Sequence, residues 1–345
     1  MPSVRHFTIV LMLLLAGALP AQAAVQFKLA TIAPEGSGWM RELRAAAEEV
    51  AERTEGRVKI KYYPGGVMGN DKKVLRKVRI GQLQGGAFTS SGLSERYPDI
   101  VIYGLPLVFD GEDEIAYVRE RMDPLLIEGL SEAGLEALGM AGGGFANLMG
   151  SEQVTTLDEL RGRKVWVPEG DTVSYAAMES LDLSPVVLPI TDVLTGLQTG
   201  LLEFVATPPV GAVVLQWYTK VKYVTEIPLA YTLGIMAVDQ RAFRRVDSAD
   251  QDVMREVIQA AYRRLDEQNL TDNESARDAL IANGLEILTP PADAVESWRA
   301  ATAQANARLV SEGIVSQRML DLLMQHVRDY RSGQATTSQR QPALE

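Results

Sequence analysis

The chain has 345 residues, of which 46% are hydrophobic and 23% charged, so it contains enough apolar material for two cores of ordinary size. Its formal net charge of −11 argues against nucleic acid and anionic membranes as partners. Cysteine is absent, which excludes disulfide bonds, thiolate metal sites and a lipid-anchored cysteine.

The N-terminus has the pattern of a secretory signal peptide. Arg5 and His6 precede an apolar run over residues 7–19, and Ala21, Gln22 and Ala23 match the small-x-small cleavage pattern. The apolar run is too short for an ordinary transmembrane helix. We therefore expect cleavage near Ala23 and a free protein in the periplasm.

The mature chain begins with alternating strand and helix patterns. Stretches with strand character lie at 25–31, 58–63, 100–103 and 135–139. Amphipathic helices are expected over 37–54 and from Asn70 or Asp71 to about Ile80. This order predicts an α/β fold with a largely parallel sheet that is covered by helices on both faces.

Residues 140–150 contain four glycines and are interpreted as a crossing between lobes rather than as an element. Thr156 and Glu159 then form a capping box before a strand over 164–167. The α/β rhythm continues with a helix from Thr172, a strand over 186–188 and a helix from Thr191, which indicates a second lobe.

A helix–glycine–strand unit occurs twice at a constant displacement. Val74, Gly81 and Ala87 in the first copy correspond to Val193, Gly200 and Ala206 in the second. Each copy runs to a polar or proline-rich tip, at 89–92 and 207–209, and open α/β sheets bind ligands at such strand ends. If the copies face each other, the ligand site lies between them; chance similarity of a generic unit is the alternative.

The longest helical stretch runs from Ser248 to Asn283 without Pro or Gly and ends at Gly284. Ser248 and Gln251 have capping-box spacing, and such a helix would be about 50 Å long, more than one lobe can cover. We interpret it as a helix buried at each end against a different lobe, with a solvated middle. The alternative is two helices broken near residues 269–273.

These patterns give an α/β fold with two lobes, a ligand cleft between the lobes and a long helix spanning both. The predicted divisions are a signal peptide at 1–23, lobe I at 24–143 plus 232–271, lobe II at 144–231 plus 272–331, and a disordered tail at 332–345. Helix is expected over most of 292–331.

Five segments resemble the extracytoplasmic solute-binding proteins of TRAP transporters, the DctP family. They are KLA at 28–30, YPGGVMG at 63–69, LPLVF at 105–109, LDELRGRKV at 157–165 and GLQTG at 196–200. The resemblance covers about residues 25–330. It implies a two-lobed periplasmic-binding-protein fold. It also implies a receptor that closes around a small organic ligand and delivers it to a cation-coupled permease with a small and a large membrane subunit.

The sequence departs from the family pattern where the ligand is held. The resemblance places arginines at the positions of Ala146 and Trp166, and an acidic and an amide residue at Ala206 and Thr207. Arginine suits carboxylates because its planar fork makes two charge-assisted hydrogen bonds, which neither Ala146 nor Trp166 can make. We therefore expect a ligand more apolar or aromatic than a C4-dicarboxylate, because a carboxylate would be buried uncompensated.

The candidate ligand-binding residues combine strand-tip positions with aromatic side chains near segments that line the cleft in the family. They are Trp39, Thr89, Ser90, Phe145, Ala146, Trp166, Asp171, Ile190, Thr207 and Tyr231. Trp166 could stack on a planar ligand or hold a cation with Glu169 or Asp171. The alternative for each aromatic residue is a place in the core, and for the two acids a solvated turn.

Nothing in the chain organises a catalytic site. The mature sequence has one histidine, His326, far from every cleft segment, and it lacks a zinc motif and a phosphate-binding glycine loop. We expect no enzyme activity, no cofactor, no metal and no nucleic-acid partner. The alternative function is an envelope carrier or sensor for a hydrophobic ligand without an active permease.

Overall fold

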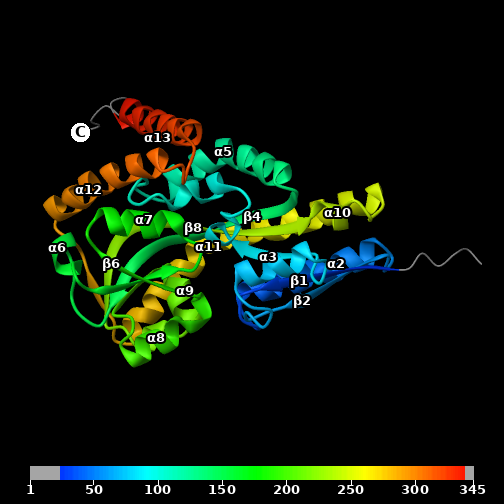
Figure 1. The fold of residues 1–345 in the computed structure, drawn as a ribbon, viewed down its shortest axis with the longest axis horizontal. Helices are drawn as coiled ribbons and strands as arrows, with labels where there is room; N and C mark the ends of the chain where they lie inside the picture. Colours follow the sequence, from blue (N-terminus) through cyan, green and yellow to red (C-terminus); the bar gives the residue numbers. More distant parts are fainter. Residues whose placement is uncertain (1–23, 339–345) are drawn as a thin grey trace, which may run out of the picture.

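The computed structural model describes residues 24–338, so the predicted signal peptide lies outside the described residues. The described chain forms two α/β lobes that share one nine-stranded sheet, with the order β2-β1-β3-β8-β4-β7-β5-β6 and β9 beside β8. Figure 1 shows the first lobe in blue and cyan, the second in green, and the long helix α11 extending from one to the other.

The strands are β1 Val25–Thr31, β2 Val58–Tyr63, β3 Gly85–Thr89, β4 Leu135–Gly150, β5 Lys164–Pro168, β6 Ser184–Leu188, β7 Phe204–Thr207, β8 Tyr223–Asp239 and β9 Glu286–Leu288. The α-helices are α2 Gly38–Arg53, α3 Asp71–Arg79, α4 Ser90–Leu93, α5 Glu112–Glu132, α6 Leu157–Leu160, α7 Thr172–Ser180, α8 Val193–Thr199, α9 Pro209–Val214, α10 Gln240–Phe243, α11 Ser248–Ala282, α12 Ala292–Ser311 and α13 Gln317–Ser338. The 3-10 turns are η1 Pro98–Gly104, η2 Ile190–Asp192 and η3 Trp217–Thr219.

Most of the predicted elements are confirmed, including both helix–glycine–strand copies, α3 with β3 and α8 with β7. The Thr156 capping box is present as expected. Helix α13 continues to Ser338, so the predicted tail is helical over 332–338, and residues 339–345 lie outside the described residues. Helix α5 was not predicted.

Two predictions of local structure before α11 are wrong. Residues 100–103 lie in the 3-10 turn η1 and not in a strand, because Pro98 starts a helical turn whose apolar side chains are buried in the lobe I core. Residues 140–150 belong to β4. Their glycines allow the strand to bulge and to pass beneath bulky side chains: a Cβ on Gly150 would lie 2.2 Å from the Phe204 ring.

Strands β4 and β8 hold the two lobes together. They pair antiparallel from Leu135 with Asp239 to Gly150 with Tyr223, so each strand belongs to both lobes. The pairing shifts between Gly142 and Gly144, and Gly144 has a φ of 93°, a value that favours glycine. This bulge leaves backbone groups without a partner in the ladder.

Helix α11 is one continuous helix, which confirms the spine interpretation. Met254 and Ile258 are buried in the lobe I core and Leu280 in a lobe II core. Asp247 and not Ser248 occupies the N-cap position, and the Gln251 side chain donates to the carbonyl of Val246, so the predicted capping box is wrong.

The polar middle of α11 is exposed on its outer face, as predicted, while its inner face bonds the bulge of β4. Asp266 accepts from the Gly142 N–H at 2.7 Å, and Asn273 donates to the Gly143 carbonyl at 3.1 Å. Asn269, which is only 8% exposed, bonds the same bulge when its amide is oriented to match the donors and acceptors around it: it then donates to the Gly143 carbonyl at 3.1 Å and accepts from the Gly144 N–H at 3.2 Å. The side chains of the spine therefore satisfy the backbone that the bulge exposes.

A buried ion pair joins α5 to the same region. Arg119, whose side chain is 9% exposed, donates to Asp266 at 2.6 Å and to Asp123 at 3.1 Å. Burial opposes the charge of Arg119, but the two carboxylates raise its pKa, so the guanidinium stays protonated. Helices from both faces of the sheet thus meet around the edge of β4.

Replacing Arg119 by Met should lower the free energy of unfolding by about 2–3 kcal/mol, because Asp123 and Asp266 would lose their shared cation. The loss should fall below that of a fully buried pair, since the Asp266 side chain is 34% exposed. Urea unfolding followed by tryptophan fluorescence measures it. Arg263→Met, at an exposed position on α11, is the control, and an equal loss in both variants would contradict the prediction.

Candidate functional site

The carboxyl ends of the parallel strands of the two lobes face one another. In lobe I, β1 pairs in parallel with β2 and β3, and all three strands end on the side of lobe II. In lobe II, β5 pairs in parallel with β6 and β7. Open α/β sheets bind ligands at such strand ends, so the space between these edges is the candidate site.

The loops that follow these strands touch across the gap. Asn70 donates from its side chain to Glu169, and the Ser94 hydroxyl donates to the Gly170 carbonyl at 3.0 Å. A Cβ on Gly66 would lie 2.8 Å from Thr191, so the lobes also meet there. We call these contacts the seam, and the structure therefore has its lobes closed against each other.

Two carboxyl groups lie beside the seam, one in each lobe. Asp71, the residue after Asn70, accepts from the N–H of Thr89 at 3.0 Å and from its hydroxyl at 2.7 Å. Asp171 accepts from the N–H of Ser174 at 2.9 Å and so caps α7. Burial raises the pKa of both carboxyls, although these hydrogen bonds act in the opposite direction.

Phe145 and Tyr231 are brought together by the crossing strands. They are paired residues of β4 and β8, and their rings meet edge to face with centroids 5.1 Å apart. The Arg119 guanidinium lies 6.0 Å from the centroid of the Tyr231 ring. Burial raises the pKa of the Tyr231 hydroxyl, so it remains a neutral phenol.

Trp166 lies in a lobe II core in this closed form. Its indole N–H donates to the Leu188 carbonyl at 2.9 Å, and its ring meets that of Trp217 edge to face at 5.1 Å. Its hydrogen-bond donor is therefore already used, and only the ring is left to contact a ligand.

The other predicted residues are spread over both lobes. Trp39 is half-buried and packs on Gly234 of β8 and on Tyr262, at 5.6 Å between ring centroids. Thr89 caps α4, whose first residue is the half-buried Ser90.

In lobe II and at the crossing, the remaining predicted residues are apolar or already engaged. Ala146 is buried and paired with Ala230. Thr207 is buried at the end of β7, opposite Asn147. Ile190 packs against the core that contains Trp166.

Sequence reasoning missed Ser94 and the role of Asn70 and Asp71 in the seam. Asn70 and Asp71 were recognised as a helix start, since Asn70 caps α3, but capping gives no sign of a contact with the other lobe. Arg119 was missed entirely, because an arginine inside a helix carries no local signal that it is buried.

Within residues 24–338, His, Asp and Glu do not gather in a group of three that could hold a metal ion. The same part of the chain has no helix that is both long enough and apolar enough to cross a membrane.

Replacing Asp71 by Asn should make the protein more stable at pH 7 but not at pH 3.5. A raised carboxyl pKa means that the folded state holds the proton more tightly than the unfolded state, so stability falls as the pH rises above the ordinary value of 3.8. Asparagine keeps an acceptor for Thr89 and removes this loss. The difference in Tm between variant and wild type, measured across this pH range, tests the prediction.

Asp293→Asn is the matched control. Both aspartates lie in the first turn of a helix, Asp71 in α3 and Asp293 in α12, but only the Asp293 side chain is exposed. A Tm difference for Asp71→Asn that is the same at both pH values, or a less stable variant at pH 7, would contradict the assignment.

Comparison with known proteins agrees with this geometry. The family described as bacterial extracellular solute-binding protein, family 7 (DctP), matches residues 29–312. The C4-dicarboxylate-binding periplasmic protein DctP of Rhodobacter capsulatus is 26% identical over 51% of this chain and 52% of its own length. The chain thus matches only about half of that relative.

Two further relatives are matched over more of their length. The sialic acid-binding periplasmic protein SiaP of Vibrio cholerae is 21% identical over 75% of this chain and 81% of its own. A crystal structure of the sugar acid binding protein DctPAm from Advenella mimigardefordensis, in complex with galactonate, superposes with a TM-score of 0.83 at 18% identity. The superposition covers 89% of this chain and 99% of the DctPAm chain, and the two proteins share the same fold.

The family match spans most of the described chain and includes both lobes and the crossing strands. These relatives are binding proteins and not enzymes, as the sequence analysis expected. The chain belongs to the DctP family of bacterial extracellular solute-binding proteins.

Proposed function

We propose that this protein is the periplasmic receptor of a TRAP-type transporter, which captures a small organic ligand between its lobes and delivers it to a permease with a small and a large membrane subunit. The family membership and the facing strand ends support this proposal. We retain the division into lobe I, 24–143 plus 232–271, and lobe II, 144–231 plus 272–331, as part of it.

Ligand binding is coupled to closure. A ligand that contacts both strand edges favours the closed arrangement, which the seam contacts of Asn70 and Ser94 then stabilise. The bulge of β4 between Gly142 and Gly144 is the natural hinge, because the ladder with β8 shifts its register there and side chains of α11 bond the Gly142 N–H and the Gly143 carbonyl.

The chemistry beside the seam carries the proposal about the ligand. Ala146 and Trp166 stand where the family resemblance places arginines, and the carboxyls near the seam, Asp71 and Asp171, already accept hydrogen bonds from Thr89 and Ser174 and offer an anion no positive charge. Arg119 is a nearby cation, but Asp123 and Asp266 already compensate it. We therefore infer a ligand that is more apolar or aromatic than the acids named for the three relatives.

Apolar and aromatic surface is what the site offers instead. Phe145 and Tyr231 present an edge-to-face pair, and Trp39 and Ile190 are half-buried. Aromatic contacts of this kind contribute about 0.5–1.5 kcal/mol each beyond the burial of apolar area.

Native mass spectrometry of the purified protein, with organic extraction of bound molecules, tests the function. We expect a small neutral or aromatic compound, which should raise the Tm of the emptied protein when added back, as a true ligand must. Millimolar succinate or galactonate should leave the Tm unchanged. Micromolar binding of a C4-dicarboxylate would contradict the ligand class, and a lipid would favour the envelope carrier.

Phe145→Ala should weaken binding of the extracted compound by about tenfold, because it removes one face of the aromatic pair. Trp166→Ala is less suitable, since loss of a core tryptophan costs about 3–5 kcal/mol of stability. Ile281→Ala, at an exposed position on α11, is the control. Calorimetric titration gives the affinities, and unchanged affinity in Phe145→Ala would remove this residue from the site.

Ser94→Ala should weaken ligand binding two- to tenfold without changing which ligands bind, because the lost hydrogen bond of about 0.5–1.5 kcal/mol joins the lobes and not the ligand. The radius of gyration of the ligand-free protein, from small-angle X-ray scattering, should rise toward that of an open form. Ser180→Ala, which removes a bond within α7, is the matched control. Equal effects in both variants would mean that the seam does not stabilise closure.

A further inference from the structure

A basic hollow lies at the pole of lobe I that is remote from the seam. Strand β3 runs from the hollow to the seam. Its first residue, Gly85, pairs with Val238 beside the hollow, and its last residue, Thr89, lies at the seam. The hollow has a volume of about 310 Å³ and is lined by Leu75, Val78, Arg79, Arg96, Gly134, Leu135, Asp239, Gln240, Arg241 and Arg244. We call it the polar hollow of lobe I.

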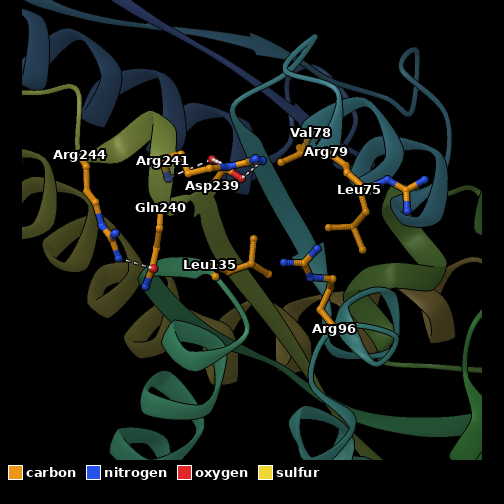
Figure 2. A pocket seen from close by; sticks show the side chains of 10 residues that line it. Leu75, Val78, Arg79, Arg96, Leu135, Asp239, Gln240, Arg241 and Arg244 are labelled. Atoms are coloured by element: carbon orange, nitrogen blue, oxygen red, sulfur yellow. Dashed lines mark hydrogen bonds and ion pairs between the residues drawn. The ribbon is translucent and has the colours of Figure 1, made fainter.

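The four arginines come from three separate parts of the chain: Arg79 from α3, Arg96 from the loop after α4, and Arg241 and Arg244 from α10 and the residue after it. Figure 2 shows them around Leu135, with Arg96 on the opposite side from Gln240 and Arg244. Convergence of distant segments distinguishes this group from a basic stretch on one helix.

Most of this positive charge is not compensated within the lining. Asp239 is the single carboxylate among the described lining residues, and it pairs with Arg241 at 3.0 Å while also capping α10. Arg244 donates to the neutral amide of Gln240 at 2.9 Å, and Arg96 donates to the backbone carbonyl of Ala133. Neither of these contacts neutralises a charge.

The shape of the hollow suits a compact anion. The buried side chains of Val78 and Leu135, with the half-buried Leu75, supply its apolar part, and the exposed guanidiniums surround them. Arginine forks bind phosphate and carboxylate groups through paired charge-assisted hydrogen bonds. The chain as a whole has a net charge of −11 and repels anions, so a hollow with four arginines is a local exception in its surface charge.

We propose that the polar hollow of lobe I binds a polyvalent oxyanion, a molecule or headgroup with two or more phosphate or carboxylate charges, at a second site independent of the solute cleft. The apolar part admits the carbon skeleton of such a molecule, and the guanidiniums hold its charges. The proposal does not depend on which solute the cleft takes.

Calorimetric titration of residues 24–345 with citrate and with pyrophosphate tests the site. We expect binding that weakens as NaCl rises from 50 to 500 mM, because the guanidiniums are exposed to solvent. The double variant Arg79→Gln, Arg244→Gln should bind about ten- to a hundredfold more weakly, since it removes two charges that have no carboxylate partner among the described residues. Its Tm should match that of the wild type.

The double variant Arg263→Gln, Arg328→Gln removes the same charge from exposed positions on α11 and α13 and should bind like the wild type. Sedimentation with vesicles that contain cardiolipin, whose headgroup carries two phosphates, with phosphatidylcholine vesicles as the blank, separates a lipid headgroup from a free anion. Vesicle binding that citrate displaces and the hollow variant loses would assign the headgroup as the source. Absence of binding in both assays, or equal binding by the two double variants, would overturn the proposal.

Discussion

The pairing of β4 with β8 is the constraint on which the rest of the structure depends. These two strands carry the sheet from one lobe to the other, and their bulge at Gly142–Gly144 would leave backbone groups unpaired in the interior. Asp266, Asn269 and Asn273 of α11 supply those partners. The bulge therefore exists without buried unsatisfied backbone groups, because side chains of α11 supply the hydrogen bonds that the ladder does not.

The fold and the chemistry of the cleft have separate physical origins. The fold rests on buried apolar side chains and on the strand order, and it matches a sugar acid receptor at 18% identity. Ala146 and Trp166, the two positions where the family resemblance places arginines, are buried within β4 and β5 and carry no charge. The fold of the family is therefore kept although the chemistry at these two positions differs from the pattern that the resemblance implies.

The parts of the fold that depend on a local sequence pattern could be predicted from the sequence. The helix from Ser248 has no Pro or Gly and an apolar stripe, so its length and its two buried ends followed from the sequence. The solvated outer face of its middle also followed from the sequence. The contacts of the inner face did not, because Asn269 meets a bulge whose position depends on the pairing with β8. In the site, Phe145 and Tyr231 meet as neighbours on paired strands, whereas the contact of Ser94 with Gly170 depends on how the lobes close.

The strand order has a consequence for how the chain folds. Strand β3 lies between β1 and β8, so the lobe I sheet is incomplete until Ile235–Val238 reach residues 85–88, roughly 150 positions later in the chain. Strands β4 to β7 all lie in the chain between β3 and β8, so they must be accommodated within the loop that this pairing closes. Such distant pairings make folding slow and leave the edge of β3 open to other strands while the chain is incomplete. The first 130 residues alone should behave as an aggregation-prone fragment and not as a domain.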